Sequence, residues 1–124
     1  MTPAARYAAA IDVLDQINAG EPAEKALTGW GRANRFAGSK DRAAVRDHVF
    51  DVLRQKRSLA ALGGGTSGRA LVLGLLRRQQ INRNDVFGAG GYAPTALTAD
   101  EVAAGDVAHG AAALDLPDWL WPQW

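Results

Sequence analysis

Apolar side chains recur every three or four residues over much of this chain, a spacing that places them on one face of an α-helix. A first helix is predicted to begin at Pro3, after a capping Thr2, and to end before Gly20. A second, short helix begins at Pro22 and carries Trp30 on its apolar side. The turn-rich stretch "RANRFAGS" then leads to a third helix.

The third predicted helix, residues 40–62, is the longest, and Ser39 is placed to cap it. Its apolar residues form a stripe roughly 120° wide. A fourth helix begins near Ser67 and is apolar all round, so it should be the central, buried one. Ala70 and Gly74, four residues apart, would let another helix approach it closely.

The second half of the chain is less regular. Residues 82–97 are predicted to form a loop packed by Val86, Phe87 and Tyr92. Thr98 and Glu101 have capping-box spacing, which starts a last short helix reaching to about residue 109. The predicted organisation is a main helical bundle at 1–81, a loop at 82–97, a short helix of the same domain at 98–110 and a tryptophan-rich tail at 111–124. Abundant alanine and sparse β-branched residues also favour an all-α fold.

Charges are distributed unevenly along the 124 residues, although the net charge is only +1. Residues 1–31 sum to −2, residues 32–83 carry twelve Lys and Arg against three Asp and sum to +9, and the remainder sums to −6. Such segregation favours a polyanionic partner for the middle segment. An uneven solvated surface would give the same pattern, and the pI of 8.2 is below the usual value for a nucleic-acid-binding domain.

The third predicted helix carries a basic strip. At about 100° per residue, a strip roughly 80° wide holds Arg46, Phe50, Arg54 and Arg57. Arginine forms paired hydrogen bonds with phosphate oxygens, and Phe50 would be available to stack between them. The alternative is that the arginines pair with Asp47 and Asp51 and that Phe50 belongs to the core, the assignment we favour for Phe50.

The glycine-rich stretch "LGGGTSGRALVLGLLRRQ" has the outline of a phosphate-binding loop but lacks its essential residues. Arg69 stands in place of the loop's lysine, Ala70 in place of its hydroxyl residue, and a helix precedes it where a strand is needed. We expect the glycines to end one helix and Thr66 or Ser67 to cap the next.

Other chemistry has little support. The chain has no cysteine, which excludes disulfides, thiolate metal sites and cysteine nucleophiles. His48 and His109 have no metal-ligand spacing around them, and His48 is expected to be a structural or surface residue. We therefore predict a chain that is not itself an enzyme and holds no metal. No apolar run approaches the ~18 residues of a membrane span, so a soluble, cytoplasmic protein without membrane contact is expected.

Two stretches, "AARYAAAIDVLDQINAGEPAEKAL" and "RFAGSKDRAAVRDHVFDVLRQKRSLAALGG", resemble the N-terminal NusB-like domain of RsmB-type ribosomal RNA cytosine-C5-methyltransferases. The similarity covers most of residues 3–81 and continues more loosely through "FGAGGYAPTALTADE" and "LPDWLWP". It implies a NusB-like helical bundle that binds small-subunit (16S) ribosomal RNA and positions a catalytic methyltransferase domain. That domain, with its S-adenosylmethionine and catalytic cysteine, has no counterpart here, so no cofactor is expected.

The resemblance also suggests which residues approach RNA. The expected RNA-binding residues are Arg6, Arg32, Arg35, Lys40, Arg46, Arg54, Lys56 and Arg57. Asp41 and Arg42 are expected instead to form a conformational pair at the start of the third helix.

The tail ends in three tryptophans, Trp119, Trp121 and Trp124, which we expect at an interface. They would pack against the next domain of a longer protein or fold back on the bundle. Two other functions stay open: a NusB-type antitermination protein acting through RNA and a protein partner, and an interaction module docking through the tail. The sequence also leaves open whether the chain is a truncated or a complete product.

Overall fold

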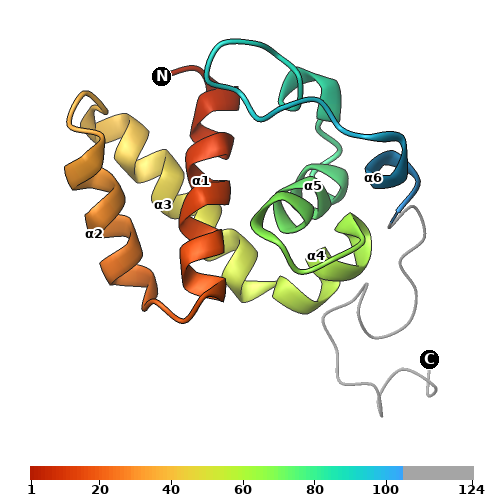
Figure 1. Ribbon diagram of the computed structural model, residues 1–124, viewed down its shortest axis with the longest axis horizontal. Coiled ribbons are helices and arrows are strands. Elements are labelled where there is room, and N and C mark those ends of the chain that lie inside the picture. The colour runs from red at the N-terminus through yellow and green to blue at the C-terminus, as the bar shows by residue number, and fades with distance from the viewer. Residues whose placement is uncertain (105–124) are drawn as a thin grey trace.

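Helices are the only regular elements in residues 1–104, the part of the chain that the structure, a computed structural model, describes. In chain order they are α1 (Pro3–Asn18), α2 (Ala23–Ala33), α3 (Ser39–Arg54), α4 (Lys56–Gly63), α5 (Gly68–Arg78), the 3-10 helix η1 (Arg83–Asp85) and α6 (Ala99–Ala103) (Figure 1). The predicted all-α class is confirmed.

Local signals explain where α1 begins and ends. The Thr2 hydroxyl accepts a hydrogen bond from the Ala5 N–H at 3.1 Å, and Pro3 occupies the first turn. After the last turn, Gly20 takes a φ of +111°, a conformation open to glycine. Both boundaries agree with the prediction.

α1 is the helix around which the others are arranged. In Figure 1 it has α2 on one side and α4 and α5 on the other, and it passes in front of α3. Its buried face includes Tyr7, Ala10, Val13 and Leu14. Every residue of α5 from 71 to 76 is buried, which confirms the prediction that this helix is a buried one, although α1 and not α5 is the central helix.

α4 and α5 cross so closely that two glycines are required. A Cβ added at Gly74 would lie 2.2 Å from the Leu59 carbonyl oxygen, and one added at Gly63 would lie 1.7 Å from the Ala70 carbonyl oxygen. Both contacts are with backbone, which cannot swing away as a side chain can. The predicted close approach at Ala70 and Gly74 is confirmed, and Gly63 is its counterpart on α4.

The single long helix predicted at 40–62 is wrong. α3 ends at Arg54, Gln55 adopts φ −128° and ψ 24°, and α4 begins at Lys56. The Gln55 backbone carbonyl accepts a hydrogen bond from the Ser58 hydroxyl at 3.1 Å, and the Gln55 side-chain oxygen accepts one from Arg78 at 2.7 Å.

The prediction that Ser39 caps α3 is also wrong. Gly38 is the N-cap residue, and its N–H is bound by the Asp41 carboxylate at 3.1 Å.

The segment after α5 packs back onto the bundle. Val86 and Phe87 are buried, as predicted, but Tyr92 is 88% exposed, so it does not help to pack the loop. The capping box of Thr98 and Glu101 is formed, although α6 ends at Ala103, well before residue 109. The predicted interface tryptophans Trp119, Trp121 and Trp124 lie outside the described residues.

No single helix within residues 1–104 has the length and apolar character needed to cross a membrane. α4 and α5 reach that length and composition only when taken together, across a bend of 92°.

Candidate nucleic-acid interface

A groove of about 490 Å³ runs between α2 and α3. Its lining includes Trp30 and four arginines against a single acid, Glu24. We call this feature the basic groove and define it by its arginines, Arg32, Arg35, Arg42 and Arg46. Since arginine is the side chain best suited to binding phosphate, the basic groove is the strongest candidate for a polyanion-binding site.

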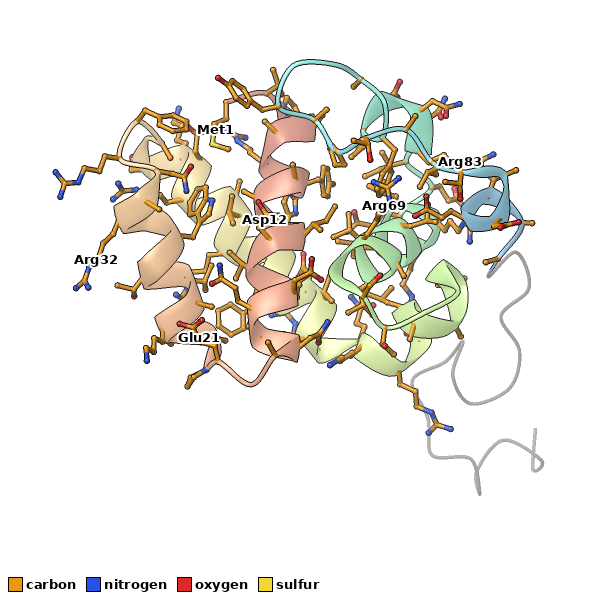
Figure 2. All side chains as sticks on the ribbon, viewed as in Figure 1. Met1, Asp12, Glu21, Arg32, Arg69 and Arg83 are labelled. Atoms are coloured by element: carbon orange, nitrogen blue, oxygen red, sulfur yellow. The ribbon has the colours of Figure 1, made fainter. Side chains whose placement is uncertain are left out.

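Two cations of the predicted RNA-binding set, Arg32 and Arg35, are exposed and form no ion pair with any residue of the described part of the chain. Lys40, in the first turn of α3, is also exposed and unpaired within residues 1–104. Arg32 extends from α2 away from the bundle (Figure 2). These three side chains can bind phosphate without first breaking an ion pair with a carboxylate.

Arg46 is also in the groove, but it is already paired. Its guanidinium donates to both Glu24 oxygens, at 2.9 and 2.5 Å, and these bonds hold the pKa of Glu24 below its usual value. The same guanidinium lies 4.9 Å from the centre of the Phe50 ring. The pair is exposed, so solvent weakens it and a phosphate can compete with Glu24. Phe50 is half-buried beneath Arg46 and does not belong to the core cluster, so our core assignment is wrong.

The basic strip predicted along one helix does not form as expected. Arg57 lies on α4, beyond the break at Gln55, while Arg54 remains on α3 and pairs with Asp51. Lys56 donates to the Asn18 side-chain oxygen at 3.0 Å. None of these cations lines the basic groove. The structure thus divides the predicted RNA-binding residues into a groove set and a set elsewhere on the surface.

Arg6 has a different environment from the one predicted. Its guanidinium contacts the Asp41 carboxylate at 3.0 and 2.9 Å, and the amino group of Met1 lies 3.5 Å from the same oxygen. These contacts join the start of α1 to the start of α3, and the hydrogen bond from Arg6 lowers the pKa of Asp41. The predicted pairing of Asp41 with Arg42 is wrong. Arg42 instead reaches the Gly31 carbonyl at 3.5 Å, within the groove.

Sequence reasoning missed the aromatic residue beside the groove. Arg35 and Phe36 are the two central residues of a turn closed by a hydrogen bond of 3.0 Å from the Ala37 N–H to the Asn34 carbonyl. Phe36 is 75% exposed, whereas Ala37 is buried. An arginine and a phenylalanine together in the turn-rich "NRFAGS" was the signal available in the sequence.

The glycine-rich loop is occupied by the protein's own groups. Ser67 caps α5, as predicted, by accepting from the Ala70 N–H at 3.1 Å. The Gly68 N–H donates to the Asp15 carboxylate at 2.8 Å, and a Cβ at Gly68 would lie 2.5 Å from the Ile11 carbonyl oxygen. The first amide of α5 therefore faces α1 and its carboxylate, an arrangement unlike an open phosphate cradle.

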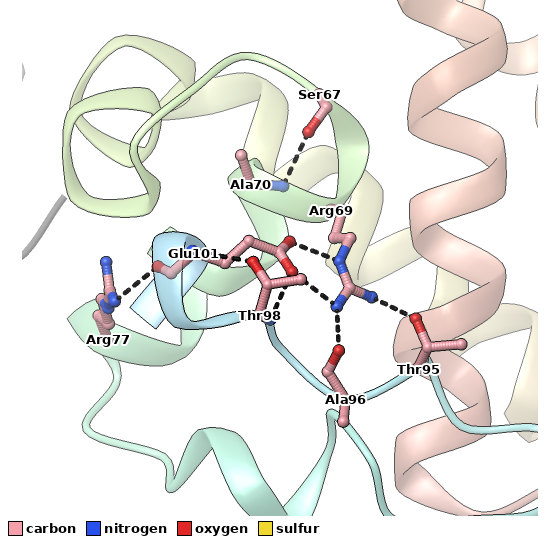
Figure 3. Close-up of polar contacts among 8 residues, drawn as sticks. All are labelled: Ser67, Arg69, Ala70, Arg77, Thr95, Ala96, Thr98 and Glu101. Atoms are coloured by element: carbon pink, nitrogen blue, oxygen red, sulfur yellow. Dashed lines mark hydrogen bonds and ion pairs between the residues drawn. The ribbon is translucent and has the colours of Figure 1, made fainter. Parts of the chain in front are cut away.

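The arginines of α5 hold the structure together and do not extend the basic surface. Arg69 pairs with Glu101 at 2.6 Å and donates to the Thr95 hydroxyl and the Ala96 carbonyl (Figure 3). Its guanidinium also lies 4.9 Å from the Phe87 ring centre. Arg77 donates to the carbonyl of Leu62 in α4 and to that of Ala104, directly after α6, both at 2.5 Å. Several cations of the middle segment are therefore held in contacts within the protein.

His48 is stacked on Tyr7, with 4.1 Å between ring centres and 15° between planes. Burial is the main cause of its lowered pKa, and the structural role predicted for it is consistent with this packing. Among residues 1–104, no three His, Cys, Asp or Glu side chains gather where they could hold a metal ion.

Comparison of the chain with known protein families, curated proteins and solved structures finds no match. The resemblance to the NusB-like domain of RsmB-type methyltransferases accordingly stays a prediction.

Proposed function

We propose that this chain is a non-catalytic RNA-binding domain that contacts the phosphate backbone through the basic groove. The observation that carries the proposal is the clustering of Arg32, Arg35 and Lys40 around one end of α2 and α3 without a carboxylate partner within the described residues. Elsewhere in residues 1–104, Arg6, Arg54 and Arg69 each have a carboxylate partner.

Electrostatics favours a polyanion over an isolated anion. The groove presents four arginines and one carboxylate over a volume of about 490 Å³, which is larger than a single phosphate needs. Successive phosphates along a nucleic-acid strand would meet several guanidinium groups at once, and each contact would release a counterion. The open form of the groove suits a chain that passes through it.

The resemblance supplies the finer part of the proposal. RNA, specifically small-subunit ribosomal RNA, is the partner that an RsmB-type relationship implies, and a methyltransferase domain would be the second partner in a full-length protein. In that arrangement this domain binds no cofactor and performs no chemistry. It would hold the substrate RNA near the catalytic domain.

Fluorescence anisotropy of the full 124-residue chain with labelled fragments of small-subunit ribosomal RNA tests the proposal. The Arg32→Ala/Arg35→Ala variant should weaken binding and reduce the slope of log K against log salt by about 2. Arg83→Ala is the matched control, because Arg83 lies on η1, on the opposite side of the bundle from Arg32, and forms no ion pair in residues 1–104 (Figure 2). It should bind almost as the wild type does.

Circular dichroism should give the same helical signal for all three proteins, since the side chains of Arg32, Arg35 and Arg83 form no ion pair or hydrogen bond in residues 1–104. Equal affinity and equal salt slope for the wild type and the double variant would refute the proposal.

A further inference from the structure

Phe36 has an aromatic ring that lies largely exposed at the protein surface. Its side chain is 75% exposed, and it is not a member of the core cluster. A large apolar side chain in water is unfavourable, and an exposed ring at a fixed position is typical of a binding surface. The exposed ring is therefore available to stack on a ligand.

The turn that carries Phe36 is fixed at both ends. Before it, the Asn34 backbone and side chain both donate to the Trp30 carbonyl, at 3.0 and 2.9 Å. After it, Ala37 is buried and the Gly38 N–H is held by the Asp41 carboxylate at 3.1 Å. Because the backbone is already ordered, little conformational entropy remains to be lost when the ring binds.

Three cations lie within four residues of Phe36 along the chain. Arg35 occupies the same turn, Lys40 follows in the first turn of α3, and Arg32 precedes in the last turn of α2. Each is exposed and unpaired within residues 1–104. An aromatic face among cations is the combination that binds single-stranded nucleic acid, since the ring stacks on a base while the cations hold neighbouring phosphates.

We propose that Phe36 stacks on an unpaired base of the bound RNA, so that the basic groove selects single-stranded segments over duplex. This inference rests on the proposed function. In a duplex the bases are stacked on one another, and a ring on a short turn reaches only the backbone and groove edges. In a loop or a single strand a base can turn outward onto the ring, while its phosphates lie against Arg32 and Arg35.

The experiment compares two RNA probes of one sequence, a single-stranded 12-mer and the same strand annealed to its complement. Phe36→Ala should weaken binding of the single strand by about tenfold, the order expected for loss of one stacked base. Its effect on the duplex should be small. Phe36→Tyr keeps the ring and should restore affinity for the single strand.

Tyr92→Ala is the matched control. Tyr92 is 88% exposed, but it lies in "GGYAPT", where no charged residue is adjacent. Removing this ring should leave both affinities unchanged. Because Phe36 and Tyr92 are both largely exposed, thermal unfolding of each variant should match that of the wild type.

The outcomes separate the inference from the proposed function. If Phe36→Ala binds the single strand as the wild type does, or loses equal affinity for both probes, stacking on an unpaired base is refuted while phosphate binding through the groove stands. That result would also be expected if the ring served a protein partner. If the wild type binds neither probe, the proposed function fails and the inference fails with it.

Discussion

The contact between α4 and α5 makes a quantitative prediction about Gly74. In the substitution Gly74→Ala, the new methyl group would lie 2.2 Å from the Leu59 carbonyl oxygen and 3.1 Å from the Gly63 nitrogen. Relief requires the two helix backbones to separate, and overpacking of this kind costs about 1–3 kcal/mol, occasionally more. Alanine regains about 1 kcal/mol because it favours the helix interior more than glycine does. Because the collision is with backbone, we take the cost at the upper end of this range, about 3 kcal/mol, and expect a net loss of about 2 kcal/mol.

Urea unfolding followed by circular dichroism measures this loss, which should also lower Tm by roughly 8 °C. Gly29→Ala is the matched control. Gly29 is in the interior of α2, has nothing within 4 Å of an added Cβ, and would gain up to about 1 kcal/mol from the same change in helix propensity. Equal or greater stability of Gly74→Ala relative to the wild type would refute the reasoning about the helix crossing.

Two further predictions concern ionisable groups. The hydrogen bond from Arg69 holds the pKa of Glu101 at about 2, below its ordinary 4.5, so its stabilisation is present above about pH 4.5 and is lost as pH falls toward 2. Glu101→Gln should be less stable than the wild type at pH 7, and unfolding measured against pH should show the difference shrinking over that window; a constant difference would contradict this. Burial lowers the pKa of His48 below 6.5, so stability should fall as pH drops below about 6.5. NMR titration of the imidazole checks it, and a pKa at or above 6.5 would be inconsistent.

The parts of the fold predicted from the sequence are those specified by local chemistry. Thr2 and Pro3 start α1, Ser67 starts α5, and the capping box at Thr98 starts α6, because each cap acts within a few residues of itself. The burial of α5 also followed from its apolar surface. These features need no knowledge of what lies across the molecule.

The break at Gln55 depends on the rest of the fold. The sequence has no glycine or proline there, and the residues on both sides favour helix, so periodicity predicted one long helix. Arg78 of α5 donates hydrogen bonds to the side chains of Gln55 and Ser58, at 2.7 and 2.6 Å, from a position 23 and 20 residues further along the chain, respectively. The spacing of apolar residues along a helix carries no information about contacts between residues so far apart in the sequence.

Charge sums along the chain overstated the basic surface for the same reason. Arg46 pairs with Glu24 across 22 residues, and Arg69 pairs with Glu101 across 32. Only the fold decides which cations are neutralised. The sequence therefore predicted a basic middle segment. Within residues 1–104 the structure neutralises part of that segment and leaves Arg32, Arg35 and Lys40 without an ion pair around the α2–α3 turn, where Phe36 had been overlooked.

The central claim is that RNA binds at the basic groove and the turn beside it. Titration of the ¹⁵N-labelled chain with a single-stranded fragment of small-subunit ribosomal RNA, followed by amide chemical shifts, tests it most directly. Our account predicts that the largest shifts fall between Trp30 and Arg46 and that Arg83 on η1 is unaffected. Shifts concentrated around η1 and α6, or no shifts at RNA concentrations that saturate binding, would contradict it.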